Sequence, residues 1–377
     1  MTLLVNFWYA SPVGHAVEAL RYCLGYHLAD PSLRIHLLLN GATATELAAL
    51  CPFIEKTYAV AFTGLDNAID DPAAALANVP RTWDYVVDAG RARLPEQLAS
   101  FAGLRRFQDA TAGHFVVRRH RGVAGEAPPA YLPPPRLELA LPAPALERAD
   151  RELAGAPLAL AIMPAGSSAK RWLYPSAASW ELIVRALRAQ HPDALFCFVG
   201  KLRNDDRTRT GIAAGEIARI ARACGNVLDA FDWPLIDQLA LVQRCRLFLS
   251  PHTGFGFAAA AVGARWLTLS GGGWPEQFYN GVPFYSVLPE PDRYPCYSDP
   301  LPVIAEDDDG EGPRTPSMCR ARIVEDLPEL LEAARTLIAG RLSYEEALAS
   351  HFRRLLAFRR GDRSRIGSFD GIHSRYV

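Results

Sequence analysis

The sequence lacks long hydrophobic runs, and no segment offers the roughly 18 uninterrupted apolar residues that a membrane-spanning helix needs. Its first residues, MTLLVNFWYASP, lack the basic start of a secretory signal and are typical of a β-strand. The 7 cysteines include no Cys-x-x-Cys pair, so we expect reduced thiols, with a pairing of Cys296 and Cys319 left open. These absences favour a cytoplasmic protein with at most peripheral membrane association.

The chain also lacks an excess of charge of either sign. Its 40 basic and 41 acidic residues give a formal net charge of −1, so nothing directs it toward nucleic acid, and we expect no such partner. A content of 50% hydrophobic and 21% charged residues is typical of globular proteins. Because 377 residues exceed one ordinary core, we expect two domains.

Several catalytic signatures are missing as well. Neither the P-loop pattern Gly-x-x-x-x-Gly-Lys-Ser/Thr nor the nucleophile elbow Gly-x-Ser-x-Gly occurs, and the histidines are not spaced for zinc. The acidic run at 306–309 is followed by the glycines and proline of 310–313, which is typical of an exposed loop. We therefore expect no metal site and no cofactor.

What the sequence contains is an alternation of short apolar runs with helical patterns. In the first half it predicts strands at 3–9, 34–40, 57–62 and 85–88, and helices at 16–28 and 43–50. Seven prolines between residues 125 and 144 predict an interdomain linker. The alternation then restarts, with strands at 158–163, 195–199, 247–249 and 266–269, and helices after the capping residue Ser176 and at 212–224, 235–245, 327–339 and 344–359. This order predicts an α/β protein with a parallel sheet in each half.

Glycine-rich or polar turns follow three strands of the second half. They are MPAGSSAKRW (163–172), VGKLRNDD (199–206) and SPHTGFGF (250–257). Because the carboxyl ends of parallel strands share one edge, these turns are expected to lie together, where backbone N–H groups and basic side chains can hold a diphosphate. In the middle turn, Asn204 and Asp205 could bind ribose hydroxyls.

The third turn also fits another interpretation, because Gly254-x-Gly256-x-x-Ala259 has the spacing of a dinucleotide-binding fingerprint. That fingerprint requires an acidic residue at the end of the next strand. The next predicted strand, 266–269, is followed by Ser270 and three glycines, and no acid occurs before Glu276. The sequence therefore disfavours NAD or FAD.

Four segments, in order, resemble motifs of glycosyltransferase family 9, the ADP-heptose:lipopolysaccharide heptosyltransferases. They are YASPVGHAVEALRYCLGYHLADPSLRIHLLLN (9–40), WDYVVD (83–88), IMPAGSSAKRWLYPSAASWELIVRAL (162–187) and LFLSPHTGFGFAAAAVGARWLTLSGG (247–272). The resemblance implies a GT-B fold, with two Rossmann-like βα domains facing an interdomain cleft. It assigns an acceptor-binding domain to 1–145, with the proline-rich linker at its end, a nucleotide-sugar donor domain to 146–340, and a helical tail at 341–377 that returns to the first domain.

The activity that this resemblance implies is that of an inverting, metal-independent glycosyltransferase of the hexosyl- or heptosyltransferase class, acting in glycan biosynthesis. A nucleotide diphosphate sugar would be the co-substrate, and the acceptor hydroxyl would belong to a glycan, a protein or a small molecule. Two alternatives remain open. One is a non-catalytic GT-B protein that binds a nucleotide sugar or a partner, and the other is a nucleotide-sugar epimerase or hydrolase.

The resemblance also assigns residues, position by position. Ser11 and Gly14 form the acceptor loop, and His15 stands where the family has an aspartate that acts as general base. An imidazole can take a hydroxyl proton near neutral pH, although a histidine that only caps the helix remains the alternative. The implied donor-binding residues are Gly166, Ser167, Ser168, Lys170, Arg171, Asn204, Asp205, His252, Thr253, Gly254 and Gly256. His252 and Phe257 replace an aspartate and a histidine of the family pattern, so His252 is expected either to hydrogen-bond a phosphate or to pack.

Overall fold

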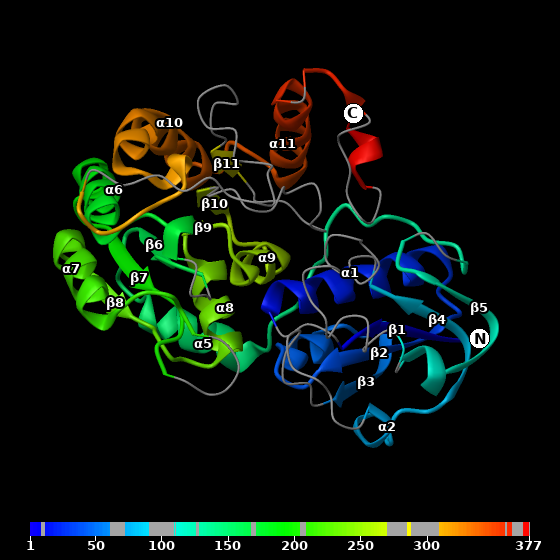
Figure 1. Ribbon diagram of the computed structural model, residues 1–377. Coiled ribbons are helices and arrows are strands. Elements are labelled where there is room, and N and C mark those ends of the chain that lie inside the picture. Colours follow the sequence, from blue (N-terminus) through cyan, green and yellow to red (C-terminus); the bar gives the residue numbers. More distant parts are fainter. Residues whose placement is uncertain are drawn as a thin grey trace. The chain divides into compact units, whose positions relative to one another are not determined.

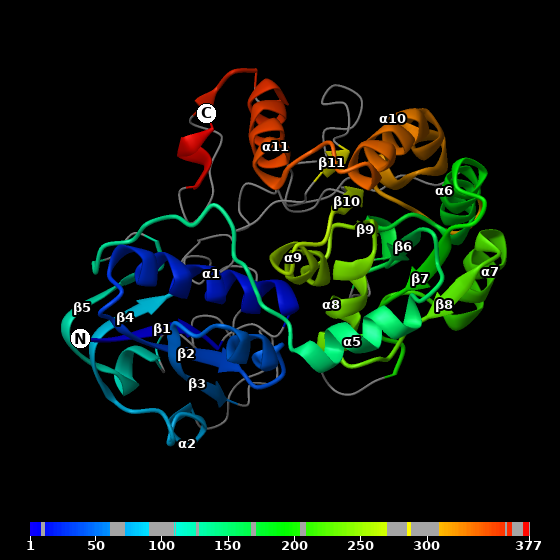
Figure 2. The same cartoon turned by 180° about the vertical axis from the view of Figure 1, so that it is seen from behind.

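The computed structural model describes residues 1–8, 12–60, 72–89, 109, 111–125, 128–166, 171–203, 209–269, 285–287, 309–358, 360–363 and 372–376. The chain divides into two compact units, which are drawn in Figures 1 and 2. The first comprises Met1–Leu139 with Gly367–Arg375, and the second comprises Ala140–Ile366 with Tyr376–Val377. Within the described residues, no helix combines the length and the hydrophobicity required to cross a membrane.

The first unit is built on a five-stranded parallel sheet with the order β3-β2-β1-β4-β5. Its strands are β1 (Thr2–Phe7), β2 (Arg34–Asn40), β3 (Ile54–Val60), β4 (Thr82–Asp88) and β5 (Val116–Val123), and its helical segments are α1 (Val13–Ala29), the 3-10 turn η1 (Thr45–Leu50) and the short α2 (Pro72–Ala75). Strand β1 pairs with both β2 and β4, so it lies inside the sheet, and its apolar residues are buried. The carboxyl end of β1, which leads into α1, therefore lies where the strand order reverses.

Strand β5 is absent from the sequence-based prediction. Its sequence, VVRRHRGV, is rich in charge because β5 is an edge strand and most of its residues are not buried. The predicted strand at 57–62 is observed at Ile54–Val60, and the predicted helix at 43–50 is the 3-10 turn η1.

The proline-rich segment is packed against α1. The buried Arg21 of α1 donates from its guanidinium to the carbonyl oxygen of Pro134 at 2.7 Å, and Leu132 N donates to the Gly25 carbonyl oxygen at 3.1 Å. A Cβ at Gly25 would lie 2.2 Å from the ring of Tyr131, so only glycine permits this approach. The segment that the sequence presents as a linker thus belongs, through Leu139, to the first unit.

The second unit contains a six-stranded parallel sheet with the order β11-β10-β9-β6-β7-β8. Its strands are β6 (Ala159–Ile162), β7 (Leu195–Phe198), β8 (Val227–Asp229), β9 (Leu247–Pro251), β10 (Trp266–Leu269) and β11 (Tyr285–Val287). Its helices are α5 (Ala143–Glu152), α6 (Ala177–Gln190), α7 (Ala214–Cys224), α8 (Leu235–Arg244), α9 (Gly254–Ala261), α10 (Arg320–Ile338) and α11 (Tyr344–Phe358), with 3-10 turns η3 (Arg171–Leu173) and η6 (Pro316–Met318). When the strands are numbered from 1 (β6) to 6 (β11), their order is 3-2-1-4-5-6, which is that of the Rossmann fold. The direction of this order reverses between β6 and β9, which is the switch point of the sheet. The predicted α/β class with two Rossmann-like sheets is confirmed.

Helix α6 follows its sequence pattern closely. The Ser176 hydroxyl oxygen accepts a hydrogen bond from Ser179 N at 3.0 Å, which is the predicted cap. The residues at helical spacing are all buried, namely Trp180, Ile183, Val184 and Leu187. The indole of Trp180 donates to the Pro164 carbonyl oxygen at 2.8 Å and so links α6 to the turn after β6.

The last helices extend the second unit. Helix α10 begins at Arg320, seven residues before the predicted start, and it lies beside α6 (Figures 1 and 2). Helix α11 contacts β11 and is grouped with the second unit, whereas the 3-10 turn η8 (Ile372–Arg375) is grouped with the first.

Candidate functional site

The first candidate region is the start of α1, directly after β1 in the chain. Pro12 occupies the N-cap position with extended backbone and no side-chain cap, and His15 N donates to the Pro12 carbonyl oxygen at 3.0 Å. Gly14 and His15 therefore lie in the first helical turn, at the switch point of the sheet. Ser11 lies outside the described residues.

His15 is close to a buried acid. Its Nδ1 lies 3.7 Å from Oε2 of Glu18, one turn further along α1, and the two side chains are 20% and 3% exposed. Sequence reasoning missed Glu18, because the predicted helix began at residue 16, whereas the observed α1 includes His15 and so places Glu18 one turn after it.

A second acid that sequence reasoning did not single out ends the neighbouring strand β4. Asp88 is buried, and its Oδ1 accepts from the Asn6 amide at 2.7 Å. Its Oδ2 lies 3.4 Å from Nε of Arg121 on β5. Because β1 and β4 pair in parallel, with Asn6 opposite Asp88, this cluster lies at the same sheet edge as the start of α1. The signal was an aspartate closing the apolar run YVVD.

In the second unit, the turns after β6 and β9 contact each other. A Cβ at Gly166 would lie 2.7 Å from Oη of Tyr174 and 3.0 Å from Cγ2 of Thr253. Any larger residue at this position would have to displace the Tyr174 hydroxyl and press on the Thr253 methyl, so the two turns meet closely at Gly166. The prediction that these turns share one sheet edge is correct for Gly166 and Thr253.

The turn after β7 joins the same edge. Gly211 N donates to the Gly166 carbonyl oxygen at 2.8 Å. Lys201 and Thr210 are joined by two hydrogen bonds. Thr210 N donates to the Lys201 carbonyl oxygen at 2.7 Å, and Lys201 N donates to the Thr210 hydroxyl oxygen at 2.8 Å. The loop that carries Asn204 and Asp205 is therefore closed at its base and tied to the turn after β6.

Two side chains fix the entry to that loop. Gln238 of α8 accepts from Gly200 N at 2.8 Å and donates to the Gly200 carbonyl oxygen at 3.0 Å. Asp232 accepts from the backbone N of Leu202 and Arg203 at 2.8 and 2.9 Å. Neither residue was predicted, because side-chain to backbone bonds over such separations leave no local pattern.

Helix α9 starts with a firmly held turn. Thr253 is buried, and its hydroxyl oxygen accepts from Gly256 N at 3.1 Å as the N-cap. A Cβ on Gly256 would lie 2.0–2.4 Å from ring atoms of Trp266, so the second glycine of the Gly-x-Gly pattern allows the indole of β10 to pack against α9. Gly254 begins the helix, whose amino end suits an anion.

The two departures from the family pattern contact each other. The rings of His252 and Phe257 meet edge to face, with centroids 5.3 Å apart, and His252 also stacks on Trp266 at 6.3 Å. The imidazole of His252 therefore lies in an aromatic cluster with Phe257 and Trp266.

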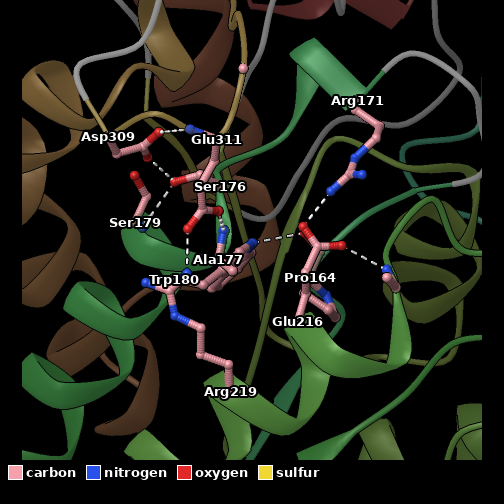
Figure 3. A network of polar contacts seen from close by, with 12 residues as sticks. Pro164, Arg171, Ser176, Ala177, Ser179, Trp180, Glu216, Arg219, Asp309 and Glu311 are labelled. Carbon is pink, nitrogen blue, oxygen red and sulfur yellow. Dashed lines mark hydrogen bonds and ion pairs between the residues drawn. The ribbon is translucent and has the colours of Figure 1, made fainter.

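Arg171 and the acidic loop belong to a polar network shown in Figure 3. Arg171 pairs with Glu216, which also accepts from Ala213 N at the start of α7. Ser176 donates to Asp309, and Glu311 accepts from Ala177 N at 2.8 Å. The described acids of this loop, Asp309 and Glu311, therefore accept hydrogen bonds from the start of α6.

The same network ties α6 to α7 through Arg219. Its guanidinium pairs with Glu181 at 2.6 Å and with Glu311. Hydrogen bonds to Glu181 and then to Glu311 raise the pKa of Arg219. Among the described residues, no group of three or more histidine, cysteine, aspartate or glutamate side chains could hold a metal ion.

Other predicted residues lie outside the described ranges. These are Ser11, Ser167, Ser168, Lys170, Asn204, Asp205 and Cys296. The structure thus brings together Gly166, Thr253, Gly254 and the base of the 201–210 loop in the second unit, and places Gly14, His15 and Glu18 together in the first.

Solved structures share this architecture. No protein-family model and no curated protein sequence matches the chain. A glycosyltransferase of family 9 from Veillonella parvula aligns at a TM-score of 0.58 with 12% identity, over 90% of this chain and 97% of that one. The ADP-heptose lipopolysaccharide heptosyltransferase II of E. coli aligns at 0.50 with 13% identity, over 89% and 100%. The E. coli heptosyltransferase WaaC with ADP aligns at 0.50 with 14% identity, over 89% and 99%. The chain therefore has the GT-B fold of the heptosyltransferases and of glycosyltransferase family 9, as its motifs predicted.

Proposed function

We propose that this protein is an inverting, metal-independent glycosyltransferase that moves a sugar from a nucleotide diphosphate sugar to an acceptor hydroxyl. The observation that carries the proposal is the joining of three turns at one edge of the second sheet. Gly166 contacts Thr253, and the Gly166 carbonyl oxygen accepts from Gly211 N at the base of the 201–210 loop. This edge lies at the β6/β9 switch point, where open α/β sheets bind nucleotides.

The donor diphosphate would lie at the start of α9. Its backbone N–H groups and helix dipole favour negative charge, and Lys170 would add a cation. Those groups can stabilise the charge that develops on the departing diphosphate, so the transfer needs no metal ion. Asn204 and Asp205, on the loop closed by Lys201 and Thr210, would bind the ribose.

The acceptor would bind at the first unit, with His15 as general base. The first turn of α1 leaves this imidazole 20% exposed and therefore open to a substrate. In an inverting transfer the hydroxyl attacks the anomeric carbon from the face opposite the diphosphate while His15 takes the hydroxyl proton. The acceptor is a glycan, a protein or a small molecule, and the chemistry of His15 is the same for each.

Calorimetric titration of nucleoside diphosphates and their sugars tests the donor site. We expect one nucleoside diphosphate to bind, and Lys170→Ala to weaken it about 10- to 100-fold, since charge-assisted hydrogen bonds to phosphate contribute about 1.5–3 kcal/mol. Lys56→Ala is the matched control, because Lys56 belongs to β3 of the first unit and packs over Tyr58. Unchanged affinity in Lys170→Ala, or thermal stabilisation by NAD and by no nucleoside diphosphate, would contradict the assignment.

Product analysis separates transfer from the alternatives. With the nucleotide sugar that binds and a panel of acceptor hydroxyls, we expect a glycoside of inverted anomeric configuration by NMR, formed at the same rate with and without EDTA. Release of free sugar with no acceptor product would instead indicate a hydrolase or epimerase. Binding without any turnover would indicate a nucleotide-sugar-binding protein.

A further inference from the structure

The start of α1 contains a pair of side chains that the proposed transfer does not yet explain. Glu18 is only 3% exposed, and its Oε2 lies 3.7 Å from Nδ1 of His15. Buried carboxylates are rare in proteins unless they are paired or hydrogen-bonded. Most i, i+3 ion pairs lie on the exposed face of a helix, so the burial of Glu18 is unusual.

The location of His15 makes the nearby carboxylate chemically important. His15 lies in the first turn of α1, where the positive end of the helix dipole disfavours a protonated imidazole. A histidine there would be a poor proton acceptor without compensation. The negative charge of Glu18, held in a site with little water, offsets this effect because it stabilises the imidazolium.

The contact also distinguishes the two ring nitrogens. Nδ1 lies 3.7 Å from Oε2 of Glu18, which is beyond hydrogen-bond distance, so the carboxylate acts on the ring through its charge, and that charge favours a proton on Nδ1. Nε2 then carries the lone pair, which is the form that a general base requires. A carboxylate that selects the tautomer of a histidine acts on catalysis without contacting the substrate.

We propose that Glu18 is the positioning residue of this site, holding His15 in the Nδ1–H tautomer and stabilising the imidazolium formed during transfer. This inference rests on the proposed glycosyl transfer. In that step the acceptor O–H bond breaks and its proton moves to Nε2 of His15. The acceptor oxygen bonds the anomeric carbon, and the bond from that carbon to the donor phosphate oxygen breaks, its electron pair leaving with the nucleoside diphosphate.

The test compares Glu18→Gln with the wild-type chain at full length. The side-chain amide of this variant carries no charge and can donate to Nδ1 as well as accept from it, so the preference for the Nδ1–H tautomer should weaken. We expect 15N NMR of His15 to report this change of tautomer, kcat to fall about 100-fold, as for loss of general base catalysis, and KM for the donor to stay within about twofold. Glu18→Asp keeps the charge and should retain the Nδ1–H tautomer and more of kcat than Glu18→Gln.

Glu55→Gln is the matched control. Glu55 is also a paired glutamate of the first unit, but it is bound to Arg34 on the strands β2 and β3. Its loss should leave both kcat and the His15 tautomer unchanged.

Two results would overturn the inference. One is an unchanged His15 tautomer in Glu18→Gln, whatever happens to kcat, and the other is an unchanged kcat in a variant whose tautomer has changed. If the wild-type chain transfers no sugar, the proposed function fails, and the tautomer comparison still decides whether Glu18 positions His15. If Glu18→Gln does not fold, the 15N spectrum of His15 in the wild-type chain decides, since a neutral imidazole in the Nε2–H form there would equally refute the inference.

Discussion

The starts of α1 and α9 both follow strands at the switch point of their sheet, yet they are built in opposite ways. Thr253 caps α9 with a buried hydroxyl, and Gly256 lies under the indole of Trp266. Helix α1 has no side-chain cap, and its first turn carries a partly exposed histidine beside a buried acid. The fixed N–H groups at the start of α9 suit the binding of an anion. The titratable imidazole at the start of α1 suits the transfer of a proton.

Replacing Gly256, on which the indole of Trp266 packs, should have the largest effect on stability. Gly256→Val places carbon atoms inside the volume of the indole, since a Cβ alone would lie 2.0 Å from the ring. We expect a loss of about 3 kcal/mol in the free energy of unfolding, measured by urea denaturation. Gly215→Ala in α7 is the control, because a Cβ there meets nothing within 4 Å. Equal stability of the two variants would show that the packing of Trp266 does not fix the start of α9.

Removing the cap of α9 should have a smaller effect. Thr253→Ala deletes the acceptor of the Gly256 N hydrogen bond and should cost about 1 kcal/mol of unfolding free energy. Thr253→Ser keeps the hydroxyl and should recover most of that loss. If alanine and serine destabilise alike, the lost methyl contacts rather than the cap account for the change.

The smallest effect concerns acid sensitivity of the first unit. His36 of β2 is buried against Tyr58 and Trp83, and burial lowers its pKa from 6.5, with nearby Glu55 acting in the opposite direction. The unfolded chain therefore takes up this proton first, so stability is lost as the pH falls below about 6.5. His36→Phe should lose less melting temperature than the wild type between about pH 7 and about pH 5.5, by on the order of 1 °C. A wild-type response in His36→Phe would refute this origin.

The sequence predicts the features that local pattern controls. The apolar runs of β6 and β9, the Ser176 cap and the buried stripe from Trp180 to Leu187 depend on burial and on backbone bonds within a few residues. The meeting of Gly166 with Thr253 followed from the rule that parallel strands end at one edge.

What the sequence did not predict depends on contacts between distant residues. Gly256 has the spacing of a phosphate-binding glycine, but the indole that requires it comes from the next strand. The charged residues of β5 hide the apolar pattern by which a strand is recognised, because β5 is an edge strand. Asp309 and Glu311 accept hydrogen bonds from residues at the start of α6 and in α7 that lie more than 90 positions earlier in the chain. The contact between Glu18 and His15 could be predicted only once both residues were placed in one helix, where positions three apart are neighbours.

The interior position of β1 and β6 also bears on how the chain folds during synthesis. Leu3 pairs with Tyr85, and Leu160 pairs with Leu247, so the first strand of each sheet waits for a partner made more than 80 residues later. Closing such long loops costs entropy before the contacts repay it, and sheets of this kind fold slowly. A ribosome at about 5–20 residues per second needs several seconds to supply each partner, and during that time an apolar strand has only one of its two neighbours. We therefore expect the yield of folded protein to depend on the translation rate across residues 40–85 and 200–247.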